Sequence, residues 1–274
     1  MNMTNPTTLN DEQIHALNAL IDKVSIRQKR DFGNINTDLK SDGTLITECD
    51  LWSDKVIVEG LSEIAKGEGV LSEEGSKKLP HTEAFWVVDP LDGTTNFSAG
   101  IPYWAISIAR FVNKKPQTAF LDIPALGKRI IAIKGKGVWL NGKPIDKNKK
   151  RASQSECVSL CSRSIRILQQ KPNQHFPGKI RLLGVSSLNM ISVGLGQTIA
   201  AIEATPKIWD IGAAWLVLKE LGCPIEWLEA NPSELNSGKD LSSVNFPLVT
   251  GNNEETINKF IPWSTLLTSN AKNI

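Results

Sequence analysis

Trp86-Val87-Val88-Asp89-Pro90-Leu91-Asp92-Gly93-Thr94-Thr95-Asn96-Phe97 is the stretch that decides the fold, because an apolar run stops there at two carboxylates and a group of hydroxyls. From Phe85 to Val88 the side chains are aromatic or β-branched without polar alternation, as in a strand covered on both faces. Pro90 suits the second position of a β-turn and Asp89 the first, so we expect Asp89 and Asp92 at the two ends of one turn. Both side chains could then reach one ion.

Two ionised carboxylates at such short range favour a cation between them. At about 4 Å they repel by roughly 4 kcal/mol at an effective dielectric constant near 20. Oxygen ligands without nearby histidine or cysteine favour Mg²⁺, Mn²⁺ or Ca²⁺ over zinc. Gly93, Thr94 and Thr95 add backbone N–H groups and hydroxyls that suit a phosphate. An ordinary strand-to-loop turn explains the same D-P-x-D-G pattern equally well, so the rest of the chain must decide.

The composition is that of a soluble globular protein with one large domain or two of ordinary size. The chain has 274 residues, of which 41% are hydrophobic and 22% charged, and its net charge is +2. This balance predicts no nucleic acid partner, and we interpret the basic run Lys147-Asn148-Lys149-Lys150-Arg151 as a solvated connector. The 4 cysteines include no C-x-x-C pair and are predicted to be reduced. With no apolar leader and no run near 18 apolar residues, we expect a cytoplasmic protein without a membrane partner.

The amino-terminal third predicts two amphipathic helices. The first begins at Asn10, a suitable N-cap, and carries apolar residues at helical spacing to Val24. Residues 33–42 are predicted to form a loop. The second helix follows Asp50, which is most simply explained as its N-cap.

A sheet is predicted next. Val70-Leu71 indicates a short strand that ends before Glu73, which would place a second acid beside the strand end at Asp89. Within residues 103–140, runs typical of strands are separated by turn residues, which predicts an antiparallel meander. The run from Asp146 to Arg151 is the expected boundary between an amino-terminal α+β part, 1–148, and a carboxy-terminal α/β part, 149–274.

The carboxy-terminal part delivers two more acids. Glu203 ends a predicted strand, 199–203, and Asp210 lies at the N-cap or in the first turn of a helix closed by Gly222. A helix N-terminus favours an anion or a metal-bound carboxylate. Other predicted strands are 158–160, 180–183 and 248–249, and other predicted helices are 188–195 and 253–260.

These features combine into one pattern. Glu73, Asp89, Asp92, Thr94 and Asp210 form an all-oxygen set, with Asp50 and Lys40 as outer members. With the stretch Trp86 to Phe97 and the motif Trp209-Asp210-Ile211-Gly212-Ala213-Ala214, the chain resembles the inositol monophosphatase family from about Leu9 to Phe260. This family belongs to the lithium-sensitive, magnesium-dependent phosphatases. The resemblance implies a layered αβαβα sandwich, a site between the two parts of the chain, and a homodimer.

The resemblance also implies roles for single residues. The implied metal ligands are Glu73, Asp89, Leu91 through its carbonyl, Asp92 and Asp210. The implied catalytic residues are Glu73 and Thr94, with Thr47 and Asp50 matching an orienting pair. The implied substrate-binding residues are Asp92, Gly93, Thr94, Thr95, Ser186, Glu203 and Asp210. The family's early Lys…Pro-x-x-x-T-x-x-D pattern lacks its proline here, so the role of Lys40 stays open.

The implied reaction is hydrolysis of a phosphomonoester. Two or three Mg²⁺ ions, with Mn²⁺ as a substitute, would activate a water and stabilise the leaving oxygen, so no covalent intermediate is needed. Glu73 and Thr94 would orient that water. A cysteine nucleophile is disfavoured, because neither Cys157 nor Cys161 lies in a glycine-rich phosphate loop.

The sequence leaves the substrate open. Discrimination is expected in the loops 161–164 and 184–187 and at Glu203. Glu203 can accept hydrogen bonds from a polyol and would repel a second phosphate. Inositol 1-phosphate therefore ranks first, histidinol phosphate second, and fructose 1,6-bisphosphate or 3′-phosphoadenosine 5′-phosphate third. A regulatory binding protein on a phosphatase fold is the alternative from another class, and nucleic-acid binding through residues 147–151 would predict steep salt dependence.

Overall fold

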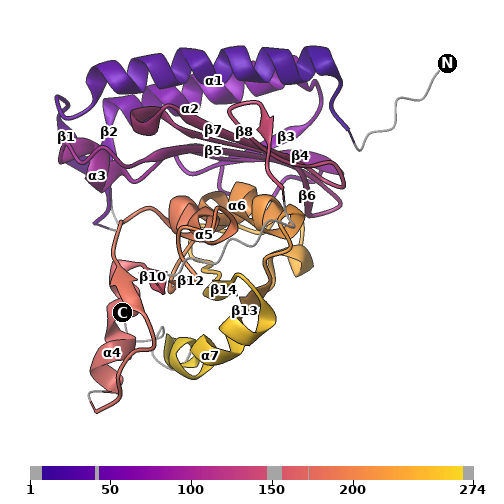
Figure 1. Cartoon of the computed structure of the whole chain (residues 1–274). Helices are drawn as coiled ribbons and strands as arrows, with labels where there is room; N and C mark the ends of the chain where they lie inside the picture. Colours follow the sequence, from indigo (N-terminus) through magenta and orange to yellow (C-terminus); the bar gives the residue numbers. More distant parts are fainter. Residues whose placement is uncertain (1–7, 41–42, 147–155, 172, 268–274) are drawn as a thin grey trace.

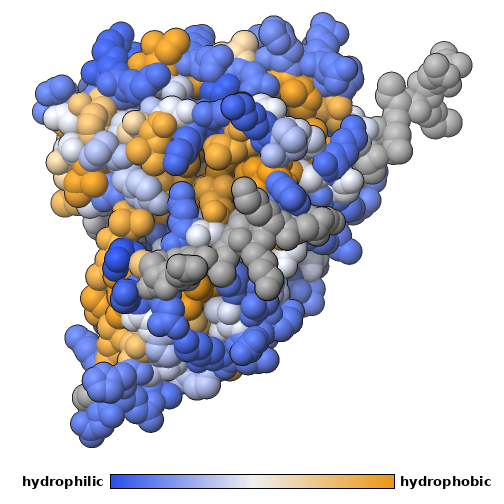
Figure 2. Space-filling model, in the orientation of Figure 1, coloured by the Kyte–Doolittle hydropathy of each residue, from blue (hydrophilic) through white to orange (hydrophobic). Residues whose placement is uncertain are grey.

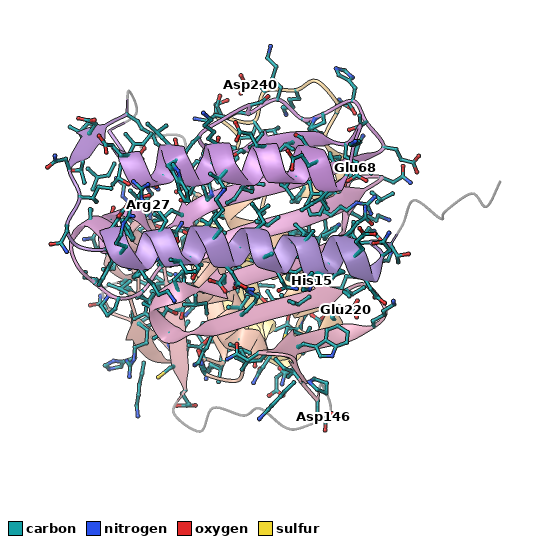
Figure 3. The ribbon with its side chains drawn as sticks, turned by 90° about the horizontal axis from the view of Figure 1, so that it is seen from above. His15, Arg27, Glu68, Asp146, Glu220 and Asp240 are labelled. Atoms are coloured by element: carbon teal, nitrogen blue, oxygen red, sulfur yellow. The ribbon has the colours of Figure 1, made fainter. Side chains whose placement is uncertain are left out.

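Two helices cover the outer face of the first sheet. The computed structural model of the protein describes residues 8–40, 43–146, 156–171 and 173–267. Helix α1 (Asp11–Asp31) begins at Asn10, which exchanges hydrogen bonds with Gln13 in a capping box. Its buried apolar face packs beside α2 (Glu48–Ile64), and the two helices lie side by side over the strands when seen from above (Figure 3).

The first sheet has seven strands in the order β3-β4-β5-β6-β7-β8-β9. Strands β3 and β4 are parallel, and every other neighbouring pair is antiparallel. The predicted meander and the strand predicted at Val70-Leu71 are therefore confirmed. The strands are β3 (Gly69–Ser72), β4 (Ala84–Asp92), β5 (Ala105–Val112), β6 (Lys115–Ile123), β7 (Lys128–Ile133), β8 (Gly137–Leu140) and β9 (Lys143–Pro144).

Strand β4 is buried on both faces, as its sequence predicts. Trp86 and Val88 belong to the core beneath α1 and α2. Phe85 and Val87 belong to the core on the opposite face of the sheet. This is the reason that the run lacks polar alternation.

Two helices, α5 (Ser186–Gly194) and α6 (Ile208–Glu220), form the middle layer. Helix α6 is apolar almost all round, which fits a helix held between two sheets. It also packs closely, because a Cβ added at Gly212 would lie 3.3 Å from the Phe111 ring on β5. Asp210, in the first turn of α6, is thus carried on a firmly packed element.

The second sheet has five strands in the order β11-β10-β12-β14-β13. Its strands are β10 (Cys157–Leu160), β11 (Lys179–Arg181), β12 (Ala200–Glu203), β13 (Ile225–Trp227) and β14 (Leu248–Gly251). Strands β10, β11 and β12 are parallel, whereas β14 is antiparallel to β12 and β13. Helices α4 (Arg166–Gln170) and α7 (Glu254–Ser264) cover its outer face (Figure 1).

The layers therefore run helix, sheet, helix, sheet, helix, and the predicted αβαβα sandwich is confirmed (Figure 1). In the same view, hydrophilic side chains cover much of the surface, and apolar ones gather along the left edge of the lower half (Figure 2). Among the described residues, no helix is both long enough and apolar enough to cross a membrane.

Some details of the predicted elements were wrong. The loop predicted over 33–42 contains strand β1 (Thr37–Leu39), which pairs with β2 (Leu45–Thr47). The strand predicted over 180–183 ends at Arg181, and β13 was not predicted. Apart from Asp146, the expected boundary run lies outside the described residues, so the division at 148 stays a prediction.

Candidate metal and phosphate site

Three carboxylates from three elements meet at one edge of the first sheet. Because β3 and β4 are parallel, with Ser72 paired to Val88, the acids Glu73 and Asp89 that follow these two residues lie side by side. The Glu73 N–H donates to the Val88 carbonyl at 3.1 Å and fixes this alignment. Asp210 reaches the same place from α6, and carboxylate oxygens of the three acids all lie within 4.8 Å of one another.

The segment between Asp89 and Asp92 is not the β-turn expected from its proline. Strand β4 continues to Asp92, and its pairing with β5 is irregular between these two acids. The Asp89 Oδ1 atom accepts the Leu91 N–H at 2.9 Å, so this carboxylate stabilises the irregular backbone. The Asp92 carboxylate turns towards α5, where it accepts the Ser187 N–H at 2.8 Å. Residues before and after Pro90 pair with β5, so the strand continues past the proline.

Asp50 is not the N-cap of α2, and the prediction that it caps this helix was wrong. Thr47 occupies that position, and Asp50 lies three residues later, where its carboxylate accepts the Thr47 N–H at 2.8 Å and the Thr47 hydroxyl. The Thr94 hydroxyl lies 2.9 Å from Asp50 Oδ1 and 3.2 Å from the Leu91 carbonyl. One capping box thus connects the start of α2 to the residues that follow β4.

Gly93 allows the chain to turn from β4 into α3 (Thr94–Ser98). Its φ angle is +105°, and a Cβ at this position would come within 2.8 Å of Val185 Cγ2. Only glycine combines this conformation with such a close approach. Thr94 and Thr95 consequently form the first turn of α3, directly beside the acids.

Lys40 contacts two acids at this edge. Its Nζ atom lies 2.8 Å from Glu73 and 2.5 Å from Glu74. Burial lowers the pKa of Lys40, but the charges and hydrogen bonds of both glutamates outweigh burial and raise it. Burial, with the neighbouring Glu73 charge, raises the pKa of Glu74 to about 7. The β1–β2 hairpin is thereby connected to the acidic group.

Glu203 lies in a second polar group, next to the first. It is 1% exposed, and its two oxygens accept hydrogen bonds from the Ser186 hydroxyl and the Asn189 amide, both at 2.8 Å. Burial raises the pKa of Glu203 to about 7. Cys161 also reaches this place, because its sulfur accepts the Ala204 N–H at 3.3 Å. The two loops predicted to line the substrate pocket, 161–164 and 184–187, therefore both reach Glu203.

Sequence reasoning missed two buried polar residues that support the site. Asn189 holds Glu203, and Gln28 donates to the Pro90 carbonyl at 2.8 Å and accepts the Trp104 indole N–H at 3.0 Å. Gln28 is fully buried, on the same face of α1 as Val24. A polar residue at an apolar position of a helix was the available signal.

The electrostatics of the acidic group fit a divalent cation. Burial, together with the neighbouring carboxylates, raises the pKa of Asp89 and of Asp210 well above the usual range. Burial likewise raises the pKa of Asp92 to about 6. A buried group of like charges must hold either protons or a cation. Because its donors are all oxygens, a hard ion such as Mg²⁺ fits the residues present.

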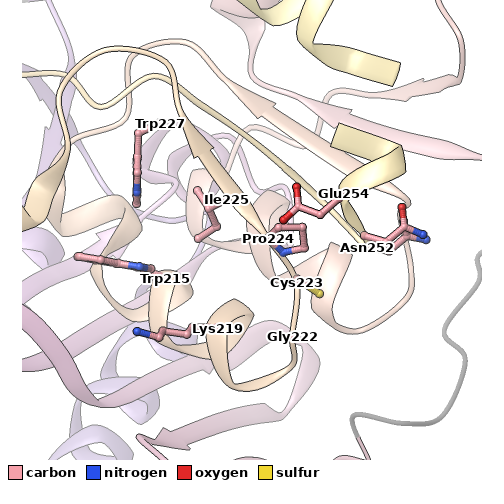
Figure 4. Close-up of a pocket in the computed structure, with 10 residues that line it drawn as sticks. Trp215, Lys219, Gly222, Cys223, Pro224, Ile225, Trp227, Asn252 and Glu254 are labelled. Carbon is pink, nitrogen blue, oxygen red and sulfur yellow. The ribbon is translucent and has the colours of Figure 1, made fainter. Parts of the chain in front are cut away.

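A separate cavity of about 500 Å³ lies at the other end of α6 (Figure 4). It is lined in part by Trp215, Lys219, Trp227 and Glu254. None of the acids described above lines it. The candidate site is therefore defined by its converging donors and not by the size of a cavity.

Comparison with known proteins agrees with this geometry. The model of the "Inositol monophosphatase family" matches residues 9–260. The chain belongs to the inositol monophosphatase family. A family relative from Thermotoga maritima named "Fructose-1,6-bisphosphatase/inositol-1-monophosphatase" is 29% identical over 185 residues, 65% of this chain and 69% of its own. "Nus factor SuhB" of Pasteurella multocida is 26% identical over 234 residues, 78% of this chain and 88% of its own.

The fold of the family is also found among solved structures. One that is described as "IMPase/NADP phosphatase complexed with Mg2+ and phosphate" has a TM-score of 0.73 and 23% sequence identity. It covers 92% of this chain and 94% of that one. This likeness shows the inositol monophosphatase fold over nearly the whole chain.

Proposed function

We propose that this member of the inositol monophosphatase family is a Mg²⁺-dependent phosphomonoesterase that hydrolyses small polyol phosphates. The observation that carries the proposal is the convergence of Glu73, Asp89 and Asp210 within 4.8 Å. When bound there, Mg²⁺ would lower the pKa of a coordinated water and offset the charge of the phosphate. The relative of known fold that is described with Mg²⁺ and phosphate supports the choice of ion.

Different residues of the chain would bind the cation and move the proton. Glu73, Asp89 and Asp210 hold the cation, with Asp92 and the Leu91 carbonyl as further ligands. The Thr94 hydroxyl, held by Asp50, is placed to take a proton from the attacking water while it gives its own to Asp50. Burial raises the pKa of Asp50, which suits a carboxylate that accepts a proton.

The capping box makes that proton acceptor rigid. Thr47 donates to Asp50 through both its N–H and its hydroxyl, so the carboxylate keeps one orientation towards Thr94. Gly93, Thr94 and Thr95 offer backbone N–H groups to the phosphate at the start of α3. The proposed reaction involves no covalent bond between a residue of the chain and phosphorus.

Within the polyol phosphates, inositol 1-phosphate is our first candidate. Glu203 and Ser186 lie next to Ser187, whose N–H contacts Asp92, and both could exchange hydrogen bonds with hydroxyls of the substrate. The Thermotoga maritima relative is named for both activities, which supports this choice and makes fructose 1,6-bisphosphate the second candidate substrate. Histidinol phosphate and 3′-phosphoadenosine 5′-phosphate rank after these two esters.

Phosphate release from these four esters, with Mg²⁺ and with EDTA, tests the proposal. We expect turnover of at least one ester with Mg²⁺ and none with EDTA. Absence of metal-dependent release from all four would contradict it.

A second candidate is a regulatory role through binding, favoured by the relative named Nus factor SuhB. Removal of Mg²⁺ distinguishes the phosphatase from the regulatory binding protein. Turnover requires the cation, whereas a metal-independent complex with a protein or RNA survives EDTA. The predicted basic run 147–151 lies outside the described residues.

We also propose a cytoplasmic homodimer. Cys49 and Cys161 form no disulfide among the described residues, which fits a reducing compartment. Leu182 and Leu183 are 48% and 38% exposed and offer an apolar contact for a second copy. Light scattering of the purified protein should give twice the mass of the chain, and a monomer would contradict the proposal.

A further inference from the structure

The ends of two parallel strands bring an arginine next to the Glu203 group. Strands β10 and β12 are neighbours, with Leu160 paired to Ile202 (Figure 1). The residues that follow each strand therefore continue side by side. Ligands of open α/β sheets bind at the carboxyl ends of parallel strands. Arg163 follows β10 at this end, and its Nη1 atom donates to the hydroxyl of Thr205, which follows β12, at 3.0 Å.

Direct contacts lead from the acidic group to this arginine. Asp92 accepts the N–H of Ser187, and the neighbouring Ser186 hydroxyl donates to Glu203. Glu203 is followed by Ala204 and then by Thr205, which holds Arg163. Arg163 is thus connected to the Glu203 group through Thr205, which lies two residues after Glu203 in the chain.

The charge on Arg163 is available to a ligand. Among the described residues, Arg27, Arg30, Arg110 and Arg129 form ion pairs with carboxylates. Arg163, Arg166 and Arg181 take part in none of the ion pairs found among these residues. Its side chain is exposed and is steadied by a neutral hydroxyl. A guanidinium has five N–H donors in a planar fork that matches the oxygens of a phosphate or carboxylate.

Among the described residues, no ion pair joins Glu203 to Arg163. Both oxygens of Glu203 already accept hydrogen bonds from Ser186 and Asn189, and Glu203 is 1% exposed. An incoming second anion would therefore meet the exposed Arg163 and not a free carboxylate. The expectation that Glu203 repels a second phosphate stays a prediction, and the positive charge of Arg163 would offset such repulsion.

We propose that Arg163 is a specificity-determining residue that binds a second anionic group of the substrate, at the end far from the phosphate that is hydrolysed. The inference rests on the proposed phosphatase function and narrows its substrate class to polyol phosphates that carry a second phosphate or a carboxylate. With this contact, a sugar bisphosphate replaces inositol 1-phosphate as the first candidate substrate.

The test compares fructose 1,6-bisphosphate, 6-phosphogluconate and inositol 1-phosphate, with Mg²⁺, for the wild type, Arg163→Gln and Arg163→Lys. We expect Arg163→Gln to lower kcat/KM for the two substrates with a second anionic group about tenfold, mainly through KM, as for loss of a charge-assisted hydrogen bond. Hydrolysis of inositol 1-phosphate should change less than about twofold. A loss confined to the bisphosphate assigns a phosphate as the second anion, and a loss confined to 6-phosphogluconate assigns a carboxylate.

Controls and a second readout make the outcome decisive. Lys219→Gln removes an exposed positive charge at the far end of α6 and should leave the ratio of the substrates unchanged. Arg163→Lys should recover part of the preference. Equal effects of Arg163→Gln on all three substrates, or no effect, would overturn the inference.

Binding separates failure of the inference from failure of the proposed function. Calorimetry measures the Kd of fructose 1,6-bisphosphate with Ca²⁺ in place of Mg²⁺, for the wild type and Arg163→Gln. If nothing is hydrolysed but the bisphosphate binds about tenfold more weakly to the variant, Arg163 is an anion site on a protein that is not this phosphatase. If Kd is equal, or the bisphosphate does not bind, the inference is wrong.

Discussion

At the scale of the residue, Gly93 is fixed by two independent constraints. An alanine there would adopt φ near +105° and place its Cβ 2.8 Å from Val185 Cγ2. We expect Gly93→Ala to lower the free energy of unfolding by about 2–4 kcal/mol, from backbone strain plus overpacking. Urea denaturation measures this loss.

Gly100→Ala is the matched control. Gly100 also has a positive φ, +73°, but nothing lies within 4 Å of its added Cβ. This variant should lose only about 1 kcal/mol. Equal losses of unfolding free energy in the two variants would show that the contact with Val185 does not affect stability.

Glu203 makes the stability of the metal-free protein depend on pH. Burial raises its pKa from an ordinary 4.5 to about 7, so the folded protein binds this proton more tightly than the unfolded chain does. Stability contributed by the proton is present below pH 4.5 and is lost as pH rises through 7. The full change is roughly 3 kcal/mol.

Glu203→Gln should therefore flatten this pH dependence. Urea unfolding at pH 5 and pH 7.5 in EDTA measures the free energy of the variant and of the wild type. We expect a smaller decrease in the variant, while the contribution of Asp92, whose pKa is raised to about 6, stays in both. An identical decrease in the two proteins would argue against a protonated Glu203.

Single residues also show what the sequence can predict about the site. Glu73, Asp89, Asp92 and Asp210 could be proposed because each acid lies at or shortly after the end of an apolar run. The structure brings Glu73, Asp89 and Asp210 together. Asn189 lies inside the apolar helix α5, and Gln28 lies on the buried face of the amphipathic helix α1. Their roles depend on partners that are distant in the chain, so no local pattern assigns them.

At the scale of the element, two helices begin with the same kind of capping box but lie in different surroundings. Helix α1 begins with a capping box of Asn10 and Gln13, and α2 with one of Thr47 and Asp50. Only the second box contacts Thr94. The two boxes therefore separate the stability of a cap from a role in the reaction.

We expect Asn10→Ala and Thr47→Ala each to cost about 1 kcal/mol of stability. Thr47→Ala should in addition lower kcat at least about tenfold, because Asp50 loses its fixed orientation towards Thr94. Thr47→Ser, which keeps the hydroxyl, should restore most of the rate. Thermal unfolding and Mg²⁺-dependent phosphate release check these outcomes, and equal kcat values for Asn10→Ala and Thr47→Ala would contradict them.

Elements were predicted best where a local pattern is strong. The amphipathic α1 and the β5–β8 meander follow from periodicity and turn residues. Strand β4 was predicted to end at Val88, before a turn that begins with Asp89, but Asp89 and Asp92 both pair with β5. Similarly, Thr47 and Asp50 are both good capping residues, and only the tertiary contact with Thr94 decides their order.

At the scale of the whole molecule, the site joins the layers of the sandwich. Its acids come from the first sheet and from α6, and the Glu203 group comes from the second sheet and α5. Binding of Mg²⁺ should therefore stabilise the whole protein. At a hundred times its Kd, the ion adds about 2.7 kcal/mol, which raises Tm by roughly 5–10 °C.

Differential scanning fluorimetry with and without Mg²⁺ measures this shift. Asp89→Asn should reduce the shift strongly, although the metal-free variant gains stability because one buried charge has been removed. Asp240→Asn, at a fully exposed acid labelled in Figure 3, should keep the full shift. A Tm that is independent of Mg²⁺ in the wild type would exclude a metal site in the folded protein.

The most direct test of the metal centre is the rate of Mg²⁺-dependent phosphate release in Asp210→Asn, Asp89→Asn and Asp240→Asn. The first two substitutions keep the size of the side chain and remove one proposed ligand. We predict that they lower kcat/KM by at least about 100-fold for the preferred ester, while Asp240→Asn keeps the wild-type rate. Wild-type rates in Asp89→Asn and Asp210→Asn would contradict the account, because catalysis would then not depend on the carboxylates that converge between β4 and α6.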